Sequence, residues 1–304
     1  MKNVLVIGGS LFVGRVFSIM ASRNGGFNLF VVNRGNHPLS LERVAQYKCD
    51  RHDPDKIARL VPDIRYDALV DFCAYEPGEI SSVIGALSDK IGQYIFISTA
   101  SVYAPGDGFL DENAPIPELP ANSNNAVAEY VRKKIGLEDE LVESCGAAGI
   151  KYTILRPTFI YGPFNYAPRE SYFIEKIAKK SAVPRPVDAS SRFNFVYVTD
   201  IADALMKCIG NDMAFNEVFN LAADEIITYP QLFSLFERLN DGPFPTREVT
   251  VSQIEEEGLP LPFPLTGDTL TNGGKFPGVF DFKYTPFSEG MEKAFKIFYS
   301  LYTN

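Results

Sequence analysis

The sequence is poor in residues that bind metals or form disulfides. Its 304 residues include only four cysteines and two histidines. The cysteines are far apart and form no Cys-x-x-Cys pair, which argues against a zinc ribbon or a disulfide framework. Neither histidine lies near a Gly-x-Ser-x-Gly turn, and a His-rich metal site needs more histidines than these. We therefore expect no metal centre, no hydrolase triad, and reduced cysteines in the core.

Basic clusters and long apolar runs are also missing. The chain has 29 Lys and Arg residues against 38 Asp and Glu residues, a formal net charge of -9, so its surface repels nucleic-acid phosphates and anionic lipids. No apolar stretch reaches the roughly 20 residues that cross a bilayer, and the first residues show no signal-peptide cleavage pattern. We expect a globular cytoplasmic protein with no membrane or nucleic-acid partner.

Short apolar runs alternate with helix-length segments in the first half of the chain. Strands are expected at residues 2–7, 28–32, 66–71, 93–98 and 151–156. Helices are expected between them, at residues 14–23, 54–60, 78–87 and 125–148. Continuous apolar strands are typical of sheets covered on both faces. The alternation therefore predicts an α/β fold with a doubly wound parallel, Rossmann-like sheet.

The pattern changes after residue 156, where a smaller C-terminal substrate domain is expected. A Gly/Pro stretch, a helix near residues 172–180 and a strand-helix unit at 193–209 follow, and the end of the chain is rich in Pro, Phe and acidic residues. The predicted dinucleotide-binding domain is 1–165 and 194–223, and the predicted substrate domain is 166–193 and 224–304. Residues 104–124 are expected to form a long functional loop.

A glycine-rich turn follows the first expected strand. Residues 8–14 read Gly-Gly-Ser-Leu-Phe-Val-Gly, and a helical pattern begins at Gly14. Glycines allow a tight turn and a close backbone approach, and the helix N-terminus offers N–H groups to a pyrophosphate. This position favours a dinucleotide site over a glycine turn without a ligand.

The end of the second expected strand carries Asn33 and Arg34 instead of an acidic residue. A carboxylate at this place accepts hydrogen bonds from the ribose of NAD, whereas an arginine can pair with a 2′-phosphate. NADP is therefore mildly favoured over NAD. The alternative is that Arg34 is a solvated loop charge.

Hydroxyl and amine groups that suit proton transfer occur further along the chain. Thr99 follows a strand at the sheet edge where open α/β folds bind ligands, and Tyr130 and Lys134 stand four residues apart on one helix face. A nearby ammonium lowers the pKa of a phenol, which can then exchange a proton with a substrate alcohol or carbonyl while hydride is transferred. Such a pair is common on helix surfaces, but its order after the glycine turn favours catalysis.

Together these segments resemble the extended short-chain dehydrogenase/reductases, the NAD-dependent epimerase/dehydratase family, in an atypical branch that includes chloroplast stem-loop RNA-binding proteins. The matching segments between residues 6 and 205 are VIGGSLFVG, CDRHD, LVDFCAY, FISTASVYAP, Tyr130-VRK-Lys134, LRPTFIYGP and FVYVTDIADAL. The resemblance implies that Thr99, Tyr130 and Lys134 are catalytic, and that the chain forms a homodimer through the helices at 78–87 and 125–148. The implied cofactor contacts are Gly8, Ser10, Leu11, Phe12, Gly14, Asn33, Arg34, Asp50, Arg51, Cys73, Ala74, Tyr75, Lys134 and Pro157.

Departures from the family pattern narrow the expected reaction. Ala100 and Ser101 stand where sugar dehydratases carry Asp-Glu, so a dehydratase is disfavoured. Leu11 replaces the usual middle glycine of the turn, and Phe159 stands where many epimerases have an asparagine. Candidate substrate contacts are Ser101, Phe159, Arg169 and Arg192, with Lys176 and Arg185 as further cations that are more typical of a solvated surface.

The leading hypothesis is an NAD(P)-dependent epimerase that acts on a nucleotide sugar through a transient keto intermediate, with Tyr130 as acid and base. Two alternatives stay open. One is an NADPH-dependent carbonyl reductase. The other is a non-catalytic nucleotide-sensing or RNA-binding protein of the same fold, which the net negative charge disfavours.

Overall fold

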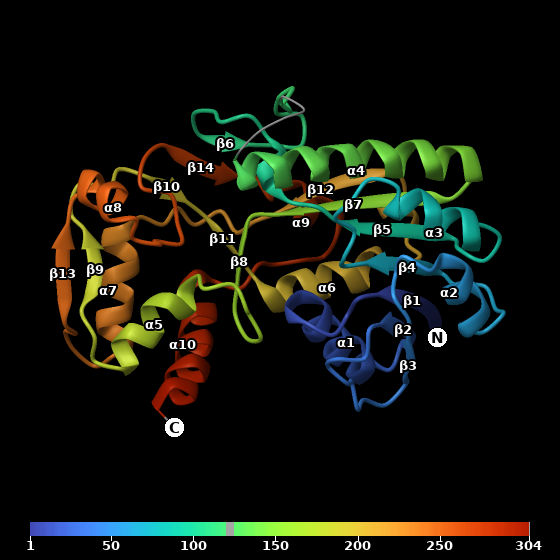
Figure 1. Cartoon of the computed structure of the whole chain (residues 1–304), viewed down its shortest axis with the longest axis horizontal. Helices are drawn as coiled ribbons and strands as arrows, with labels where there is room; N and C mark the ends of the chain where they lie inside the picture. The colour runs from blue at the N-terminus through green and yellow to red at the C-terminus, as the bar shows by residue number, and fades with distance from the viewer. Residues whose placement is uncertain (120–124, 304) are drawn as a thin grey trace.

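A computed structural model describes residues 1–119 and 125–303. Its centre is a seven-stranded sheet in the order β12-β7-β5-β4-β1-β2-β3, in which every neighbouring pair is parallel (Figure 1). The strands are β1 (Lys2–Ile7), β2 (Phe27–Asn33), β3 (Val44–Lys48), β4 (Ala68–Asp71), β5 (Gln93–Ile97), β7 (Lys151–Pro157) and β12 (Glu217–Leu221). The expected doubly wound α/β fold is confirmed.

Helices cover both faces of the sheet (Figure 1). On one face lie α1 (Phe12–Asn24) and α6 (Val198–Cys208), which pack on each other. On the other lie α2 (Pro54–Leu60), α3 (Glu79–Leu87) and α4 (Ala126–Ala148). Each face has its own apolar core, and the central strands are therefore buried on both sides. This double burial explains why continuous apolar runs marked most of these strands in the sequence.

The edge strand β3 was not predicted. Its residues are half-buried or exposed, so Val44–Lys48 lacks the continuous apolar pattern of the inner strands. It pairs only with β2, at the end of the sheet. Hydrogen bonding to a neighbouring strand, and not hydrophobic patterning, decides its conformation.

A second lobe lies beside the large sheet (Figure 1). Its helices are α5 (Glu170–Ala178), α7 (Tyr229–Leu239), α8 (Val251–Glu257) and α10 (Phe287–Thr303). Its strands form small sheets: β6 (Phe109–Leu110), β8 (Phe159–Tyr161), β9 (Val183–Pro186), β10 (Arg192–Phe193), β11 (Phe195–Tyr197), β13 (Thr246–Val249) and β14 (Asp268–Thr271). The core of this lobe is aromatic, and Phe173 and Phe193 both stack on Phe263.

One C-terminal segment packs on the first lobe. In α9 (Lys275–Val279) and just after it, Phe276 and Phe280 contact Phe219 of β12 and join the core of the large sheet. The division into residues 1–165 with 194–223 and 166–193 with 224–304 stays a prediction. Of the expected loop 104–124, residues 120–124 lie outside the described part, and the rest contains β6, which pairs with β14. Within residues 1–119 and 125–303, no helix is both long and apolar enough to span a bilayer.

Candidate functional site

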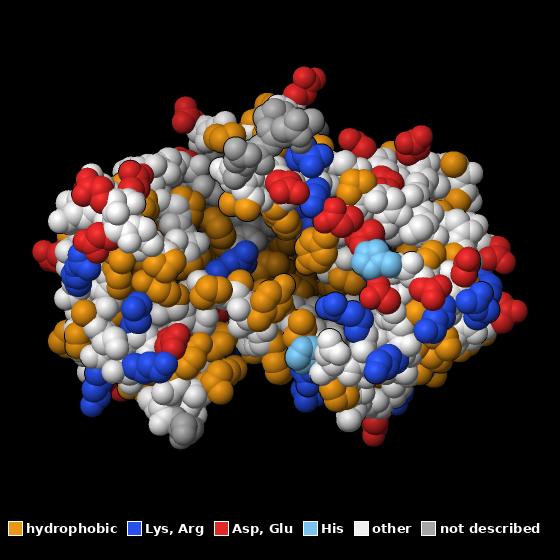
Figure 2. All heavy atoms as spheres, viewed as in Figure 1, with side chains coloured by type: hydrophobic (Ala, Val, Ile, Leu, Met, Phe, Trp, Pro, Cys, Tyr) orange, Lys and Arg blue, Asp and Glu red, His pale blue; other side chains and the backbone are white. Residues whose placement is uncertain are grey.

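A cavity of about 720 Å³ opens at the carboxyl ends of the central strands. It is bounded by the turn after β1, the ends of β2, β4 and β5, helix α4, and the loop that joins β8 to α5. Figure 2 shows this hollow between the two lobes, with basic and apolar side chains around it. Strand order reverses between β1 and β4, and open α/β sheets bind ligands at such a point.

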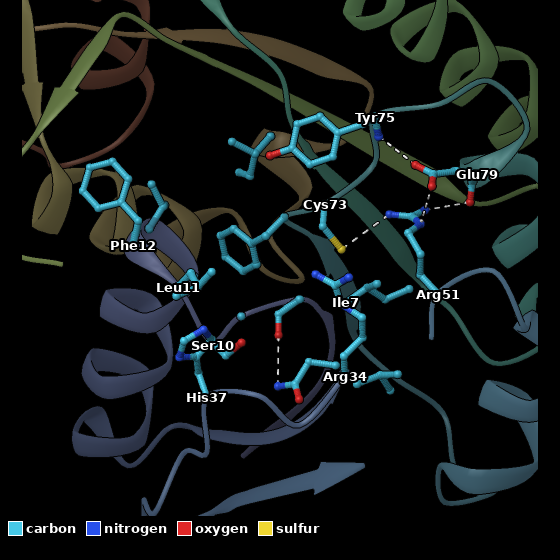
Figure 3. Close-up of a pocket in the computed structure, with 18 of the residues that line it drawn as sticks. Ile7, Ser10, Leu11, Phe12, Arg34, His37, Arg51, Cys73, Tyr75 and Glu79 are labelled. Atoms are coloured by element: carbon cyan, nitrogen blue, oxygen red, sulfur yellow. Dashed lines mark hydrogen bonds and ion pairs between the residues drawn. The ribbon is translucent and has the colours of Figure 1, made fainter. Parts of the chain in front are cut away.

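The glycine turn takes the conformation that its sequence requires. Gly8 and Gly9 have positive φ angles of 93° and 70°. A Cβ atom placed on Gly14 would lie 2.6 Å from the Cα of Gly9, so the turn and the first turn of α1 touch backbone to backbone. Ser10, Leu11 and Phe12 line the cavity next to this contact (Figure 3).

The start of α1 has the properties of an anion site for a dinucleotide. Its N-cap residue is Leu11, whose side chain makes no capping hydrogen bond, and Phe12, Val13 and Gly14 face the cavity. The amides of the first helical turn therefore lie beside the hollow without a side-chain cap. At the end of β5, the buried Oγ of Ser98 also lines the cavity and has no hydrogen-bond partner among the described residues. The uncapped amides and the Ser98 hydroxyl could both bind a polar ligand. Ser98 was not predicted as a site residue from the sequence.

Tyr130 lines the cavity, and Thr99 lies close behind it. The two residues come from α4 and from the end of β5, and Thr99 is near enough to influence the Tyr130 phenol. Burial raises the pKa of Tyr130, while the Thr99 hydrogen bond and the positive charge of Arg169 lower it. Burial outweighs these two effects, so the pKa of Tyr130 lies above its ordinary value.

Lys134 lies one helical turn beyond Tyr130 and is almost completely buried. Its Nζ atom donates hydrogen bonds to the carbonyl oxygens of Ala74 at 3.1 Å and Ile97 at 3.0 Å, and lies 6.0 Å from the centre of the Tyr130 ring. Burial lowers the pKa of Lys134 to about 8. Two protein carbonyls thus orient the ammonium of a residue that lines the cavity.

Arg51 is an internal ion-pair residue, although it also lines the cavity (Figure 3). Its Nη1 atom is 3.0 Å from Oδ1 of Asp71, and its Nη2 atom donates to the Glu79 carbonyl at 2.8 Å. The hydroxyl of Tyr94 donates to the second Asp71 oxygen at 2.6 Å. Because these partners are buried, the charge of Arg51 is neutralised within the protein. Arg51 is therefore not a free cation that could bind a phosphate.

The rim beside this ion pair carries Asp50 and a residue that the sequence did not single out, His52. The ring nitrogens of His52 lie 2.7 Å from Asp50 Oδ1 and 2.7 Å from Glu79 Oε1. Hydrogen bonds from His52 lower the pKa of Asp50. The sequence shows that Asp50 and His52 are two residues apart. It does not show that Glu79, at the start of α3, lies beside them.

Asn33 and Arg34 have different places at the end of β2. The Asn33 amide donates to the Gly8 carbonyl at 3.4 Å and its oxygen accepts from Gly35 N at 2.8 Å and Gln46 Nε2 at 2.7 Å. Asn33 therefore holds the glycine turn in place. The exposed Arg34 lines the cavity.

Several predicted contacts lie outside the cavity wall as far as the chain is described. Ala74 is fully buried and contributes its carbonyl to Lys134 instead, and Pro157 is buried in β7 next to β12. Phe159 packs against the aromatic core, 5.7 Å from the ring of Phe263. Ser101 donates its N–H to Thr99 Oγ1 at 3.2 Å.

The second-lobe cations predicted as substrate contacts have other partners. Arg192 is ion-paired with Asp268 on the neighbouring strand β14. Arg185 pairs with Glu237 at 2.9 Å, and the Lys176 ammonium lies 5.2 Å from the centre of the Tyr172 ring. These three are not cavity residues. Arg169 is the cation of this group that lines the cavity.

The structure thus gathers most predicted residues around one hollow, while their chemical roles stay predictions. The predicted residues on the cavity wall are Gly8, Ser10, Leu11, Phe12, Gly14, Asn33, Arg34, Asp50, Arg51, Cys73, Tyr75, Tyr130, Lys134 and Arg169. Burial raises the pKa of the Cys73 thiol to about 12, so that it stays protonated.

Comparison with known proteins agrees with this arrangement. A model of the NAD-dependent epimerase/dehydratase family matches residues 80–222. The chloroplast stem-loop binding protein of 41 kDa b from Arabidopsis thaliana is 28% identical over 263 residues, which are 82% of this chain and 65% of that protein. The chain thus resembles the NAD-dependent epimerase/dehydratase family, whose model matches just under half of it. It spans about 65% of the length of that plant relative, and the resemblance seen in the motifs is confirmed.

Two further similar proteins have different activities. The 2′-dehydrokanamycin reductase of Streptomyces kanamyceticus is 24% identical over 250 residues, 80% of this chain and 68% of the reductase. A UDP-glucuronic acid 4-epimerase from Bacillus cereus, solved with NAD, superposes with a TM-score of 0.78 over 99% of each chain at 16% identity. That likeness shows the shared fold.

Proposed function

We propose that the chain is an NAD(P)-dependent epimerase that acts on a nucleotide sugar through a transient keto form of the sugar. The observation that carries this proposal is the position of Tyr130 beside the buried ammonium of Lys134, on the wall of the cavity that also contains the glycine turn, with Thr99 close to Tyr130. The similar proteins include a UDP-glucuronic acid 4-epimerase and a 2′-dehydrokanamycin reductase, and both activities fit such a site.

The residues of the cavity suit a nicotinamide dinucleotide. The glycine turn and the uncapped start of α1 would hold the pyrophosphate, and Lys134 and Ser98 would face the nicotinamide ribose. When bound, this cofactor would accept a hydride from a carbon atom of the substrate and could return it. Arg34 supports a preference for NADP, since it is exposed at the cavity and the neighbouring Asn33 is engaged by the protein.

The side chains of this chain would move and hold the proton. Tyr130, as a phenolate, accepts the proton of the substrate hydroxyl, and Thr99 holds the same oxygen by a hydrogen bond. The charge of Arg169 favours the phenolate and opposes the effect of burial. After the keto sugar has turned its other face, Tyr130 returns the proton to the oxygen, and the epimer is formed. Ala100 and Ser101 offer no acid that could expel water, which is consistent with epimerisation and not dehydration.

The homodimer stays part of this proposal. Helices α3 and α4 pack together on one face of the sheet, and α4 exposes Val127 and Val142. These apolar side chains would be covered by a second copy. Light scattering of the full chain measures the mass in solution, and a monomer at micromolar concentration would contradict this part.

The test compares the wild type with Tyr130→Phe. The nucleotide released on denaturation is identified, and each protein is then incubated with NAD or NADP and UDP-glucuronic acid while chromatography follows the epimer. We expect the wild type to form epimer without net consumption of cofactor, and Tyr130→Phe to bind the cofactor but lose turnover by about a thousandfold or more. Retained turnover in Tyr130→Phe would contradict its role.

The reductase is the second candidate, because the Streptomyces relative is a reductase. It would consume one NADPH for each carbonyl reduced, and its product would differ in oxidation state from the substrate. The non-catalytic alternative predicts salt-dependent binding of stem-loop RNA that Tyr130→Phe leaves unchanged. Assays of the wild type and of Tyr130→Phe therefore distinguish the epimerase, the reductase and the non-catalytic protein.

A further inference from the structure

Arg169 is held rigidly at the cavity. It stands at the start of α5, its Nη1 atom donates to the carbonyl of Ile160 at 2.9 Å, and its guanidinium lies 6.0 Å from the centre of the Phe159 ring. These contacts use one N–H and one face of the guanidinium. Its remaining donors lie at the cavity wall beside Tyr130 and Tyr166.

This guanidinium has no acidic partner in the described residues 1–119 and 125–303. No carboxylate there lies within 4.0 Å of it, in contrast to Arg185 and Arg192 of the same lobe. The adjacent carboxylate, Glu170, is turned away and accepts hydrogen bonds from Gly162 N at 2.8 Å and Asn165 Nδ2 at 3.1 Å. Burial lowers the pKa of Arg169, and the charge of nearby Glu170 offsets only part of this effect.

The acidic residues of the cavity wall do not neutralise Arg169, because each has a cation or histidine of its own. Asp50 pairs with His52, Glu76 pairs with Lys133 at 2.7 Å, and Glu79 pairs with Arg51 and His52. The charge that acts on the Tyr130 phenol is the positive one of Arg169. A desolvated guanidinium in a binding cavity is stabilised by an anionic group of the ligand, and its planar fork matches a carboxylate.

We propose that Arg169 binds a carboxylate that the sugar carries next to the carbon whose hydroxyl Tyr130 deprotonates. The substrates are then nucleotide-activated sugar acids, and neutral hexoses bind less well. This inference rests on the proposed function and adds the charge of the sugar to it. Phosphate groups of the nucleotide offer similar oxygens, so the test compares two ligands that share the same diphosphate.

The experiment measures binding to the full chain saturated with NADP⁺. UDP-glucuronic acid and UDP-glucose are titrated by calorimetry into the wild type, Arg169→Gln, Arg169→Lys and the control Arg247→Gln. Arg247 is an exposed residue of the second lobe that pairs with Glu257. We expect the wild type to bind UDP-glucuronic acid about tenfold to a hundredfold more tightly than UDP-glucose, as for a charge-assisted hydrogen-bonded pair.

Arg169→Gln should remove most of this difference by weakening UDP-glucuronic acid alone, and Arg247→Gln should keep it. Arg169→Lys keeps the charge without the fork, so it should show an intermediate preference and serves as the test if the glutamine variant does not fold. Equal binding of the two ligands by the wild type would overturn the inference. So would a loss of both ligands to the same extent in Arg169→Gln, since this would place Arg169 at the shared diphosphate.

Failure of the proposed function has a different signature. If neither UDP-sugar binds the NADP⁺-loaded chain, the proposed nucleotide-sugar function fails, and this inference fails with it. If both bind but without preference, the proposed function stands and the role of Arg169 is wrong.

Discussion

The guanidinium of Arg156 and the carboxylate of Glu138 form a buried two-point ion pair, with Nε 3.0 Å from Oε1 and Nη2 2.5 Å from Oε2. Arg156 lies on β7 and Glu138 on α4, one turn after Lys134. The same guanidinium donates to the Tyr103 hydroxyl at 2.9 Å, which donates to Asn220 of β12 at 2.7 Å. The pair therefore fixes the helix that carries the proposed proton-transfer residues against two strands.

Glu138→Ala should lower the free energy of unfolding by about 3–5 kcal/mol, because it leaves the Arg156 charge buried without its counter-ion. Urea denaturation measures this change. The double variant Arg156→Met with Glu138→Leu removes both charges and keeps apolar volume, so it should recover most of the loss. A double variant as unstable as Glu138→Ala would show that the cost does not come from the unpaired charge.

Gly14→Ala should disrupt the glycine turn. The added Cβ would lie 2.6 Å from the Cα of Gly9, which is backbone and cannot rotate away. We expect the affinity for NADP⁺ to fall by at least about tenfold, or about 1.4 kcal/mol, in a fluorescence titration.

The matched control for this substitution is Gly136→Ala on α4, where an added Cβ meets nothing within 4 Å. It should stabilise the protein by about 0.5–1 kcal/mol, because alanine is the better helix former, and leave the affinity unchanged. If both alanine variants bind NADP⁺ as the wild type does, the Gly9–Gly14 contact is not needed for the cofactor.

The charge of Lys134 should make cofactor binding depend on pH. Burial lowers its pKa from 10.5 to about 8, so the folded protein loses this proton before the unfolded chain does. We expect the affinity for NADP⁺ to decrease as the pH rises through about 8, since the neutral amine no longer attracts the cofactor. The contribution of Lys134 to stability has the opposite trend and increases between about pH 8 and about pH 10.5, because the unfolded state binds more protons there.

Lys134→Met should bind NADP⁺ more weakly and without this pH step, which titrations from about pH 7 to about pH 9 can measure. Lys293→Met is the control, because Lys293 pairs with Glu289 on the exposed side of α10 and does not line the cavity. A wild-type affinity that stays flat over this range would argue that Lys134 does not act on the cofactor.

Glu170 should make stability depend on pH in the acidic to neutral range. Burial raises its pKa from 4.5 to about 7, so the folded state binds more protons between these values, and the contribution of Glu170 to stability falls as the pH rises. Glu170→Gln cannot ionise. Its free energy of unfolding relative to the wild type should therefore increase by about 3 kcal/mol from about pH 4.5 to about pH 7, measured in urea.

Glu175→Gln on the same helix is the control for Glu170, because its side chain pairs with Lys179 and is largely exposed. It should differ from the wild type by a small amount at every pH. A Glu170→Gln variant with an equally constant difference would mean that Glu170 ionises normally in the folded protein.

Local rules predicted much of the fold and part of the site. The inner strands were visible because both faces of the sheet are buried, and helix α4 because its spacing brings Tyr130 and Lys134 onto one face. The glycine turn was visible because backbone angles near those of Gly8 and Gly9 favour glycine. The proximity of Tyr130 and Thr99 followed from their expected places on the helix and at the sheet edge, and the family resemblance added their catalytic role.

The sequence by itself determined the inner strands of the parallel sheet and the glycine turn at its edge, since apolar pattern and backbone freedom depend on residues that are neighbours in the chain. The edge strand β3 depended on its pairing with β2. Only the tertiary structure decided which charges remain available. Arg51 is held by Asp71 and Glu79, Arg192 by Asp268, and Arg169 alone of the second-lobe candidates faces the cavity. The physical reason is that a charge is satisfied by whatever group folding brings within a few ångströms, and those groups are distant in the chain.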